Sequence, residues 1–245
     1  MVLSSEKIQE NYNIFKDICK KYLFENRPQI EKLLNDYEDK LLFSPASSFA
    51  HYHNAFPGGY IDHVLRVINF AVAEYSTWKS DGLRCDFTPE ELVFSAVFHD
   101  FGKLGLPEYE SYVVNPSKWH RENLGKLYEK DKNQPWLTNT DATLFILQRY
   151  NIQCTLNEYY AIRLHDGLYE DSNKTYYISQ STEQKLRSNI PYILHIADMK
   201  AARFEFERWI ENSSNSSFYN FTNHNKIKPS SKPNVQQLNP FADIV

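Results

Sequence analysis

Apolar residues recur at every third or fourth position over long stretches of this 245-residue chain, and this spacing strongly limits its fold. Between residues 5 and 23, for example, Ile8, Tyr12 and Phe15 begin such a series. The spacing places an apolar stripe along one side of an α-helix. The chain contains only 7 glycines, which argues against sandwiches and barrels built from many tight turns. The sequence therefore predicts an all-α fold, a bundle of helices.

The helix that should lie at the centre of this bundle covers residues 60–79, which are apolar nearly all round between Val64 and Val72. The next helix has a clear beginning, because Thr88, Pro89 and Glu91 form the pattern of a capping box. We expect the other helices at residues 5–23, 28–43, 117–131, 138–150, 155–166 and 189–210.

Composition divides the chain into three parts. A short helical extension is expected at residues 1–45 and the main helical domain at 46–211. Residues 212–245 are rich in serine, asparagine and proline without periodicity, which predicts an irregular tail.

Charge and cysteine content narrow the class of protein. The formal net charge of −4 gives no overall basic field to attract long nucleic acid. The three cysteines form no CxxC pair, as expected for reduced thiols in a cytosolic protein. The first residues lack the apolar core of a signal peptide, and no stretch is as apolar as a membrane span. We therefore expect a soluble cytoplasmic protein with no membrane partner.

Polar residues interrupt the most apolar helices at a few positions. His63 lies inside the central helix, His99 and Asp100 end the next one, and Asp198 lies in an apolar stretch of the last helix. A buried carboxylate needs a cation nearby, because an unpaired one costs several kcal/mol or becomes protonated. Two imidazoles and two carboxylates are suitable ligands for a first-row divalent metal ion.

Ordinary structural roles are the alternatives for these residues. Asp198 could instead form an ion pair with Lys200 or Arg203. Isolated histidines are usually core or surface residues, and that interpretation is applied first to His51, His195 and His224.

The order of these four residues resembles the HD-domain superfamily of metal-dependent phosphohydrolases. Its signature is a histidine, a His-Asp doublet and a distant aspartate on a helical bundle. Three segments, HNAFPGGYIDHVLRV, FSAVFHDFGKLG and ILHIADMKAARFE, are similar to the family's entry, central and final segments. The likeness extends from Ala50 to Trp209 and implies that residues 46–211 form an HD-type catalytic domain.

The resemblance implies roles for individual residues. His63, His99, Asp100 and Asp198 would be the metal ligands. Lys103, in the HDxGK segment, would bind substrate phosphate as a point charge. A solvated surface lysine is the alternative for Lys103.

Further histidines raise the question of a second metal ion. His120 and His165 occupy places similar to the additional histidines of two-metal family members. Those members often carry a His-His pair where this chain has His165 and Asp166. With one metal, both histidines would line the pocket and contact phosphate. Their ordinary alternatives are a surface helix residue for His120 and a polar helix end for His165.

The implied reaction is attack on phosphorus by a water molecule that a metal ion activates. Asp100 would orient the water or bridge two metals, and His120 or His165 would protonate the leaving group. His53 and Arg66 are candidates for substrate contact, with exposed positions as the alternative. The mixed ligand set suits Mn, Fe, Ni, Co or Zn, and Mg is also compatible.

The substrate expected from this chemistry is a nucleotide or a related small phosphorylated molecule. A 3′–5′ exonuclease acting on short single-stranded RNA or DNA is the alternative enzyme, although no oligonucleotide-binding barrel is predicted. A non-catalytic nucleotide sensor and a helical interaction scaffold are the non-enzymatic alternatives. The amphipathic helices of the N-terminal extension are compatible with a homo-oligomer.

Overall fold

The computed structural model describes residues 3–212 and confirms the all-α fold. Its α-helices are α1 (Ser5–Tyr22), α2 (Gln29–Asp36), α3 (Glu38–Phe43), α4 (Gly59–Ser80), α5 (Pro89–Phe98), α6 (Lys118–Asn123), α7 (Asn139–Arg149), α8 (Leu156–Leu164), α9 (Lys174–Tyr177) and α10 (Ile190–Asn212). Short 3₁₀ helices are η1 (Phe101–Leu104), η2 (Gly167–Tyr169) and η3 (Asp171–Asn173). The predicted tail lies outside the described residues, apart from its first residue.

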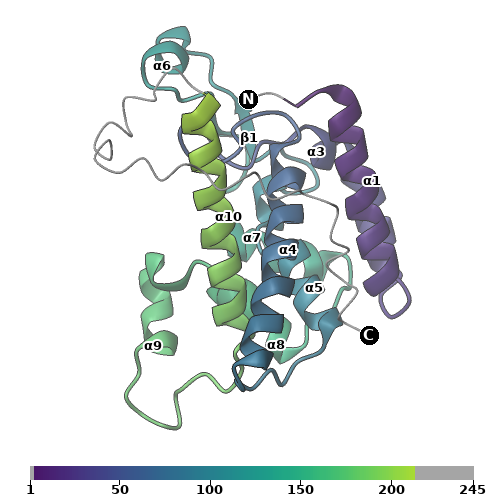
Figure 1. The fold of residues 1–245 in the computed structure, drawn as a ribbon. Helices are drawn as coiled ribbons and strands as arrows, with labels where there is room; N and C mark the ends of the chain where they lie inside the picture. The colour runs from purple at the N-terminus through teal and green to yellow at the C-terminus, as the bar shows by residue number, and fades with distance from the viewer. Residues whose placement is uncertain (1–2, 213–245) are drawn as a thin grey trace, which may run out of the picture.

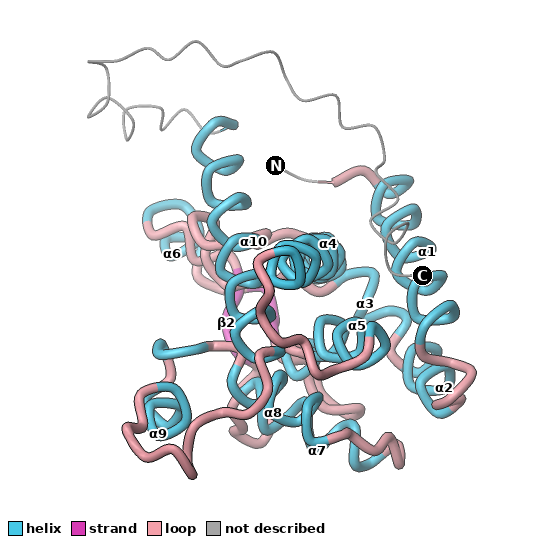
Figure 2. The backbone as a smooth tube through the Cα atoms, turned by 60° about the horizontal axis from the view of Figure 1, so that its bottom comes forward, coloured by secondary structure: helices cyan, strands magenta, loops and turns pink. Residues whose placement is uncertain are grey.

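Helices α4 and α10 lie side by side at the centre of the bundle (Figure 1). The apolar stretch of α4 is buried as predicted, with Val64, Val67 and Ile68 fully covered. Helix α5 packs against α4, and α8 packs against both α5 and α10. Figure 2 shows this arrangement from a second direction. Burial of apolar side chains between these helices is the main source of stability for such a bundle.

Helix α5 begins with the capping box that the sequence predicts. The Thr88 side chain accepts a hydrogen bond from the backbone N–H of Glu91, and the Glu91 carboxylate accepts one from the backbone of Thr88. Pro89 occupies the first turn, where no N–H is needed. The start of α5 is therefore determined locally, and its far end carries His99.

The N-terminal helices pack on the bundle and share its core. Phe15 of α1, Leu33 of α2 and Leu41 of α3 belong to the same buried cluster as α4 and α5. The single helix predicted at 28–43 is wrong, because Tyr37 breaks it with φ −104° and ψ 9°. The Tyr37 hydroxyl instead donates a hydrogen bond to the Gly105 carbonyl at 3.0 Å.

The prediction of one helix over residues 117–131 is correct only for its first part. Helix α6 ends at Asn123, and Gly125 adopts φ +64°, a left-handed conformation that ends a helix. The chain then forms β2 (Tyr128–Lys130), which pairs antiparallel with β1 (Tyr112–Val114). Backbone pairing with a distant segment has replaced local helical bonds here.

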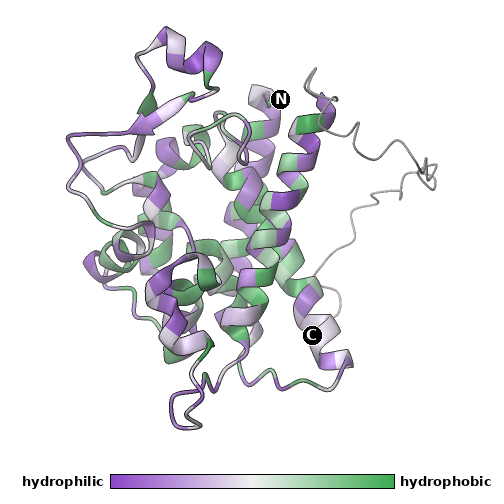
Figure 3. Ribbon diagram, turned by 90° about the vertical axis from the view of Figure 1, so that its left-hand side faces the viewer, coloured by the Kyte–Doolittle hydropathy of each residue, from purple (hydrophilic) through white to green (hydrophobic). Residues whose placement is uncertain are grey.

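Hydropathy follows the architecture. Hydrophobic residues concentrate in the central helices, and hydrophilic residues predominate on the outlying segments (Figure 3). No helix within residues 3–212 is both long and apolar enough to cross a lipid bilayer.

Candidate metal centre

His63 reaches the centre of the molecule from the second turn of α4. The helix begins at a glycine pair, and Gly58 adopts φ +76°. A Cβ atom on Gly59 would lie 2.1 Å from the Asn54 carbonyl oxygen, so no larger residue fits there. This close approach brings the loop that carries His53 against the start of α4. The His63 side chain is fully buried.

His99 and Asp100 lie where α5 ends and the chain changes direction. His99 still has helical backbone angles, whereas Asp100 has φ −119° and ψ 17° and leads into η1. The turn is held by Gly102, whose N–H donates to the Thr143 hydroxyl at 2.8 Å. A Cβ atom on Gly102 would lie 2.1 Å from the Asn139 carbonyl oxygen. This tight packing against α7 determines where Asp100 and Lys103 point.

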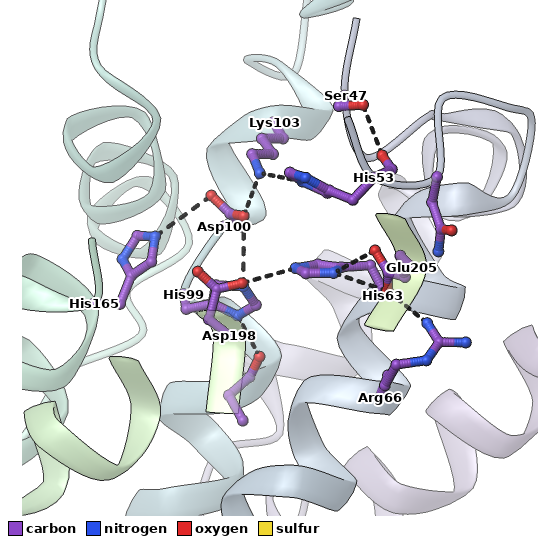
Figure 4. Close-up of polar contacts among 12 residues, drawn as sticks. Ser47, His53, His63, Arg66, His99, Asp100, Lys103, His165, Asp198 and Glu205 are labelled. Atoms are coloured by element: carbon purple, nitrogen blue, oxygen red, sulfur yellow. Dashed lines mark hydrogen bonds and ion pairs between the residues drawn. The ribbon is translucent and has the colours of Figure 1, made fainter. Parts of the chain in front are cut away.

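Asp198 comes from α10 and completes a cluster with the two histidines (Figure 4). Its Oδ1 atom lies 3.1 Å from His63 Nε2 and 3.9 Å from His99 Nε2. One ligand atom from each of the three residues lies within 4.8 Å of the other two, a spacing that could hold a metal ion. The alternative partners of Asp198 are engaged elsewhere, Lys200 with Glu74 and Arg203 with Glu207.

Both imidazoles direct their Nε2 atoms toward this point. His63 Nδ1 lies 3.2 Å from both carboxylate oxygens of Glu205, and His99 Nδ1 lies 2.8 Å from the Ala96 carbonyl oxygen. Donation from Nδ1 leaves a lone pair on each Nε2 atom. Both Nε2 atoms are buried and face carboxylate oxygens, His63 Nε2 with Asp198 Oδ1 at 3.1 Å and His99 Nε2 with Asp100 Oδ2 at 3.4 Å. In a neutral imidazole the Nε2 lone pair would face a negatively charged oxygen, so the donor set fits a cation bound between them.

Asp100 lies between the cluster, which it approaches at His99, and two further basic side chains, Lys103 and His165. Its Oδ2 atom is 2.5 Å from Lys103 Nζ and 3.4 Å from His99 Nε2, while Oδ1 is 3.6 Å from His165 Nε2. Burial alone would raise the pKa of Asp100, but Lys103 and His99 hold it well below its usual value. The carboxylate is therefore ionised beside the candidate metal-binding cluster.

Lys103 and His53 meet on the same side of the centre. Lys103 Nζ lies 3.4 Å from His53 Nε2, and the His53 ring centroid lies 4.9 Å from that of His63. Burial by itself would lower the pKa of Lys103, but Asp100 raises it above its usual value. Lys103 is thus a largely buried cation at the site, not a solvated surface lysine.

Arg66 and Glu205 form a second layer behind His63. Glu205 is 4% exposed and pairs with both His63 and Arg66. Arg66 also contacts Asp62 at 3.0 Å. Arg66, a predicted substrate contact, is therefore engaged with carboxylates on the Nδ1 side of His63. Glu205 was not anticipated from the sequence, although its seven-residue spacing from Asp198 places both on one face of α10.

The two histidines proposed for a second metal ion have different surroundings. His165 is buried, and its Nε2 atom lies 3.6 Å from an oxygen of Asp100 and from one of Asp166. His120 lies in α6 with its ring against Trp119. No ion pair joins His120 to the cluster within residues 3–212. Within residues 3–212 the structure brings His165, but not His120, next to the cluster of His63, His99 and Asp198.

His195, expected from the sequence to be an isolated residue, supports the site. Its Nδ1 atom donates to the carbonyl of His165 at 2.7 Å, and it lies three residues before Asp198 on α10. A cavity of about 320 Å³ opens beside Asp198. Besides Asp198, it is lined by Asp166, Tyr169, His195, Met199, Ala202 and Arg203. The Asp198 side chain is 21% exposed, so the cluster is accessible from this cavity.

Comparison with known proteins gives no match: no family model fits the sequence, and no curated protein and no solved structure is significantly similar to it.

Proposed function

We propose that this protein is a metal-dependent phosphohydrolase of the HD type. The observation that carries the proposal is the pair of buried Nε2 atoms of His63 and His99, which converge on the Asp198 carboxylate at 3.1 Å and 3.9 Å. A nitrogen and carboxylate donor set of this kind suits Mn, Fe, Co, Ni or Zn. Asp100 would be the fourth ligand, since its Oδ2 atom lies 3.4 Å from His99 Nε2.

When bound, such an ion supplies Lewis-acid polarisation of a phosphoryl oxygen and a water molecule made more acidic. The protein's own residues supply the remaining chemistry. Lys103 binds a negatively charged phosphate oxygen, as its ammonium group is held next to the cluster by Asp100. Asp100 orients the attacking water through an ionised oxygen.

His165 is the residue we assign to the leaving group. Its Nδ1–H is committed to the Ile162 carbonyl at 2.8 Å, so only Nε2 faces the site. In its doubly protonated form, His165 would donate the Nε2 proton to the departing oxygen and remain as a neutral imidazole. In a two-metal form the same atom would become a ligand. His120 would join the site only if α6 moved, so one metal ion fits the described geometry better.

The cavity beside Asp198 favours a small organic phosphate as substrate. Its volume of about 320 Å³ is at the lower end of the range for ligand pockets. Tyr169 offers an exposed ring for stacking, and Arg203, which pairs with Glu207, also lines the cavity. A nucleotide-sized molecule is the best fit. The open ring of Tyr169 also keeps a short single strand as the second candidate substrate.

The test is metal content and turnover measured on the same preparation. Protein purified without chelator is analysed for transition metals, then assayed with added Mn²⁺ on an aryl phosphodiester, mononucleotides and short oligonucleotides. We expect about one equivalent of metal and hydrolysis. His99→Ala is expected to lose both, whereas the matched control His51→Ala, outside the cluster, keeps both.

The outcomes separate the alternatives. Preference for mononucleotides supports the nucleotidase, and preference for oligonucleotides supports the exonuclease. Nucleotide binding without turnover indicates a sensor. Absence of metal from wild-type protein, with no turnover, rejects the proposal and leaves the helical scaffold. Loss of half the metal in His165→Asn would indicate two ions, and unchanged metal content would indicate one.

A further inference from the structure

A second cavity lies on the other side of His63 from the metal cluster. It has a volume of about 200 Å³ and lies between α4, α10 and the loop at residues 50–56. Its walls are formed by Leu3, Ala50, Asn54, Ala55, Phe56, Asp62, Arg66, Leu127, Glu205, Arg208 and Trp209. None of the metal-cluster residues lines it. The proposed hydrolysis gives this cavity no role.

The carboxylates of this cavity are already occupied. Asp62 accepts hydrogen bonds from Asn11 and Asn54 as well as from Arg66. Glu205 accepts from His63 and Arg66. Their oxygens are therefore committed to the protein. A ligand in the cavity would meet few free acceptors.

Arg208 is the group that remains available. Within residues 3–212 its guanidinium has no carboxylate partner, in contrast to Arg66. Both arginines approach the Phe204 ring, with their Cζ atoms 5.0 Å (Arg208) and 5.1 Å (Arg66) from its centroid. Two guanidinium groups thus approach one ring, and Arg66 pairs with both carboxylates of the cavity while the exposed Arg208 pairs with neither. An anion in the cavity would gain a charge-assisted contact with Arg208.

The rest of the cavity wall is apolar. Trp209, Phe56 and Leu127 provide most of the large side chains, and Ala50 and Ala55 leave room between them. A flat apolar group fits such a wall, and an attached anionic head would reach the arginine side. We propose that this cavity binds a small organic anion made of a single ring and a phosphate-like or carboxylate head, with Arg208 as its charged contact.

The cavity shares two elements with the metal centre. Arg66 holds Glu205, which in turn receives the Nδ1–H of His63. The loop that forms the opposite wall also carries His53, which contacts Lys103. A ligand that shifts Arg66 or this loop would change how firmly His63 is held. Binding at the cavity is therefore coupled to metal affinity, and by linkage the coupling is reciprocal.

The test uses phenylphosphonate, a single ring with a dianionic head and a carbon–phosphorus bond that phosphoester hydrolysis does not cleave. The full-length, metal-loaded protein has four tryptophans, so its indole N–H signals in a ¹H–¹⁵N spectrum are few, and Trp209→Phe identifies the relevant one. We expect phenylphosphonate to shift the Trp209 signal in a saturable manner, and the uncharged analogue phenol to cause no such shift.

Variants show whether Arg208 is responsible. Arg208→Met keeps the apolar stem, removes the charge and should weaken phenylphosphonate binding by about tenfold or more. Lys200→Met removes an exposed charge from the same helix, one that pairs with Glu74, and should leave the shift unchanged. No Trp209 shift in wild type, or an equal affinity in Arg208→Met, overturns the proposal.

A second measurement tests the coupling. The apparent Mn²⁺ affinity is measured with and without phenylphosphonate, at one concentration that saturates the wild type, for both wild type and Arg208→Met. For each protein, the affinity with phenylphosphonate is divided by the affinity without it, and the two ratios are compared. We expect the two ratios to differ by about fivefold. Equal ratios would reject the coupling. Neither measurement needs hydrolysis, so failure here is distinguishable from failure of the proposed function.

Discussion

At the scale of single residues, the geometry of the candidate site depends on how each imidazole is held from behind. His63, His99 and His165 all direct Nδ1 toward a protein oxygen and leave Nε2 for the centre. Such outer hydrogen bonds select the tautomer and orient the ring. Glu205 has this role for His63 and is the one charged partner among the three.

Replacement of Glu205 by Gln is expected to weaken metal binding without abolishing it. The amide can still accept a hydrogen bond from His63 but loses its charge and its ion pair with Arg66. We expect a 10–100-fold lower metal affinity, on the order found for such outer-layer changes. Competition with a chelator measures it. Glu207→Gln, on the exposed side of the same helix, is the control, and an equal loss there would contradict the argument.

The cysteine thiols are expected to differ in reactivity. All three cysteines are free. Burial raises the pKa of Cys154 to about 11 and that of Cys19 further above its usual value. A raised pKa leaves less thiolate at pH 8, so alkylation is slower. Iodoacetamide labelling followed by mass spectrometry should modify Cys85 first. Fastest labelling at Cys19 would contradict the burial described.

At the scale of secondary structure, helix ends position the site. His99 follows the last residue of α5, and His165 follows the last residue of α8. Each ring donates to the carbonyl three residues earlier, one of those that the helix end leaves without an intrahelical partner. The end of a helix therefore supplies both the location and the tautomer. The turn after α5 then depends on Gly102.

Substitution of Gly102 by Ala should disturb this turn. The new Cβ atom would lie 2.1 Å from the Asn139 carbonyl oxygen and 2.8 Å from the Ala142 side chain, so η1 must move away from α7. We expect a loss of about 2–3 kcal/mol in the free energy of unfolding, with weaker metal binding because Asp100 moves.

Gly82→Ala is the matched comparison for this change. Gly82 adopts φ +80° in an open loop, and a Cβ atom added there would meet nothing within 4 Å. Backbone strain in Gly82→Ala should lower the free energy of unfolding by about 1–2 kcal/mol and leave the metal affinity unchanged. Urea denaturation and metal titration measure both quantities. A Gly102→Ala protein that binds metal normally would show that the turn does not position Asp100.

At the scale of the whole molecule, the candidate metal ligands lie on helices that are distant in the chain. His63 lies on α4, His99 ends α5 and Asp198 lies on α10, so an ion bound to all three would link the centre of the bundle. A ligand that binds only the folded state raises stability in proportion to the logarithm of its concentration over Kd.

Removal of metal should therefore lower the thermal stability of the wild-type protein. At a free metal concentration about 100 times Kd, the stabilisation is about 2.7 kcal/mol. For a chain of this size that corresponds to a Tm difference of roughly 5–10 °C. Thermal denaturation with and without chelator measures the shift. The His99→Ala protein should show no chelator effect, and an equal shift in that variant would place the metal elsewhere.

The helices were predictable where local signals agreed. The capping box at Thr88, the apolar periodicity of α4 and the spacing in α1 each determine an element from nearby residues alone. The predictions were wrong at Tyr37 and beyond Asn123, where a distant contact competes with helical bonds. Residues 46–211 as a separate catalytic domain and the substrate class remain predictions.

The site was predictable in part for a related reason. Polar residues in apolar helices mark burial, and this indicated His63, His99, Asp100 and Asp198 from the sequence. Glu205 and His195 were missed because their helix looks ordinary until the neighbours of Asp198 on the same face are considered. His120 remains a predicted site residue that the described structure leaves apart from the cluster.

The sequence by itself determined that the chain forms apolar helices and that a few ionisable groups must be buried in them, because periodicity and capping act through neighbouring residues. Only the tertiary structure decided which of those groups meet. The packing of α10 on α4 brings Asp198 next to His63 and pairs Arg66 with Glu205. It also places Arg208 in the wall of a cavity. Distances between side chains on different helices depend on how the whole core packs, and no local pattern specifies them.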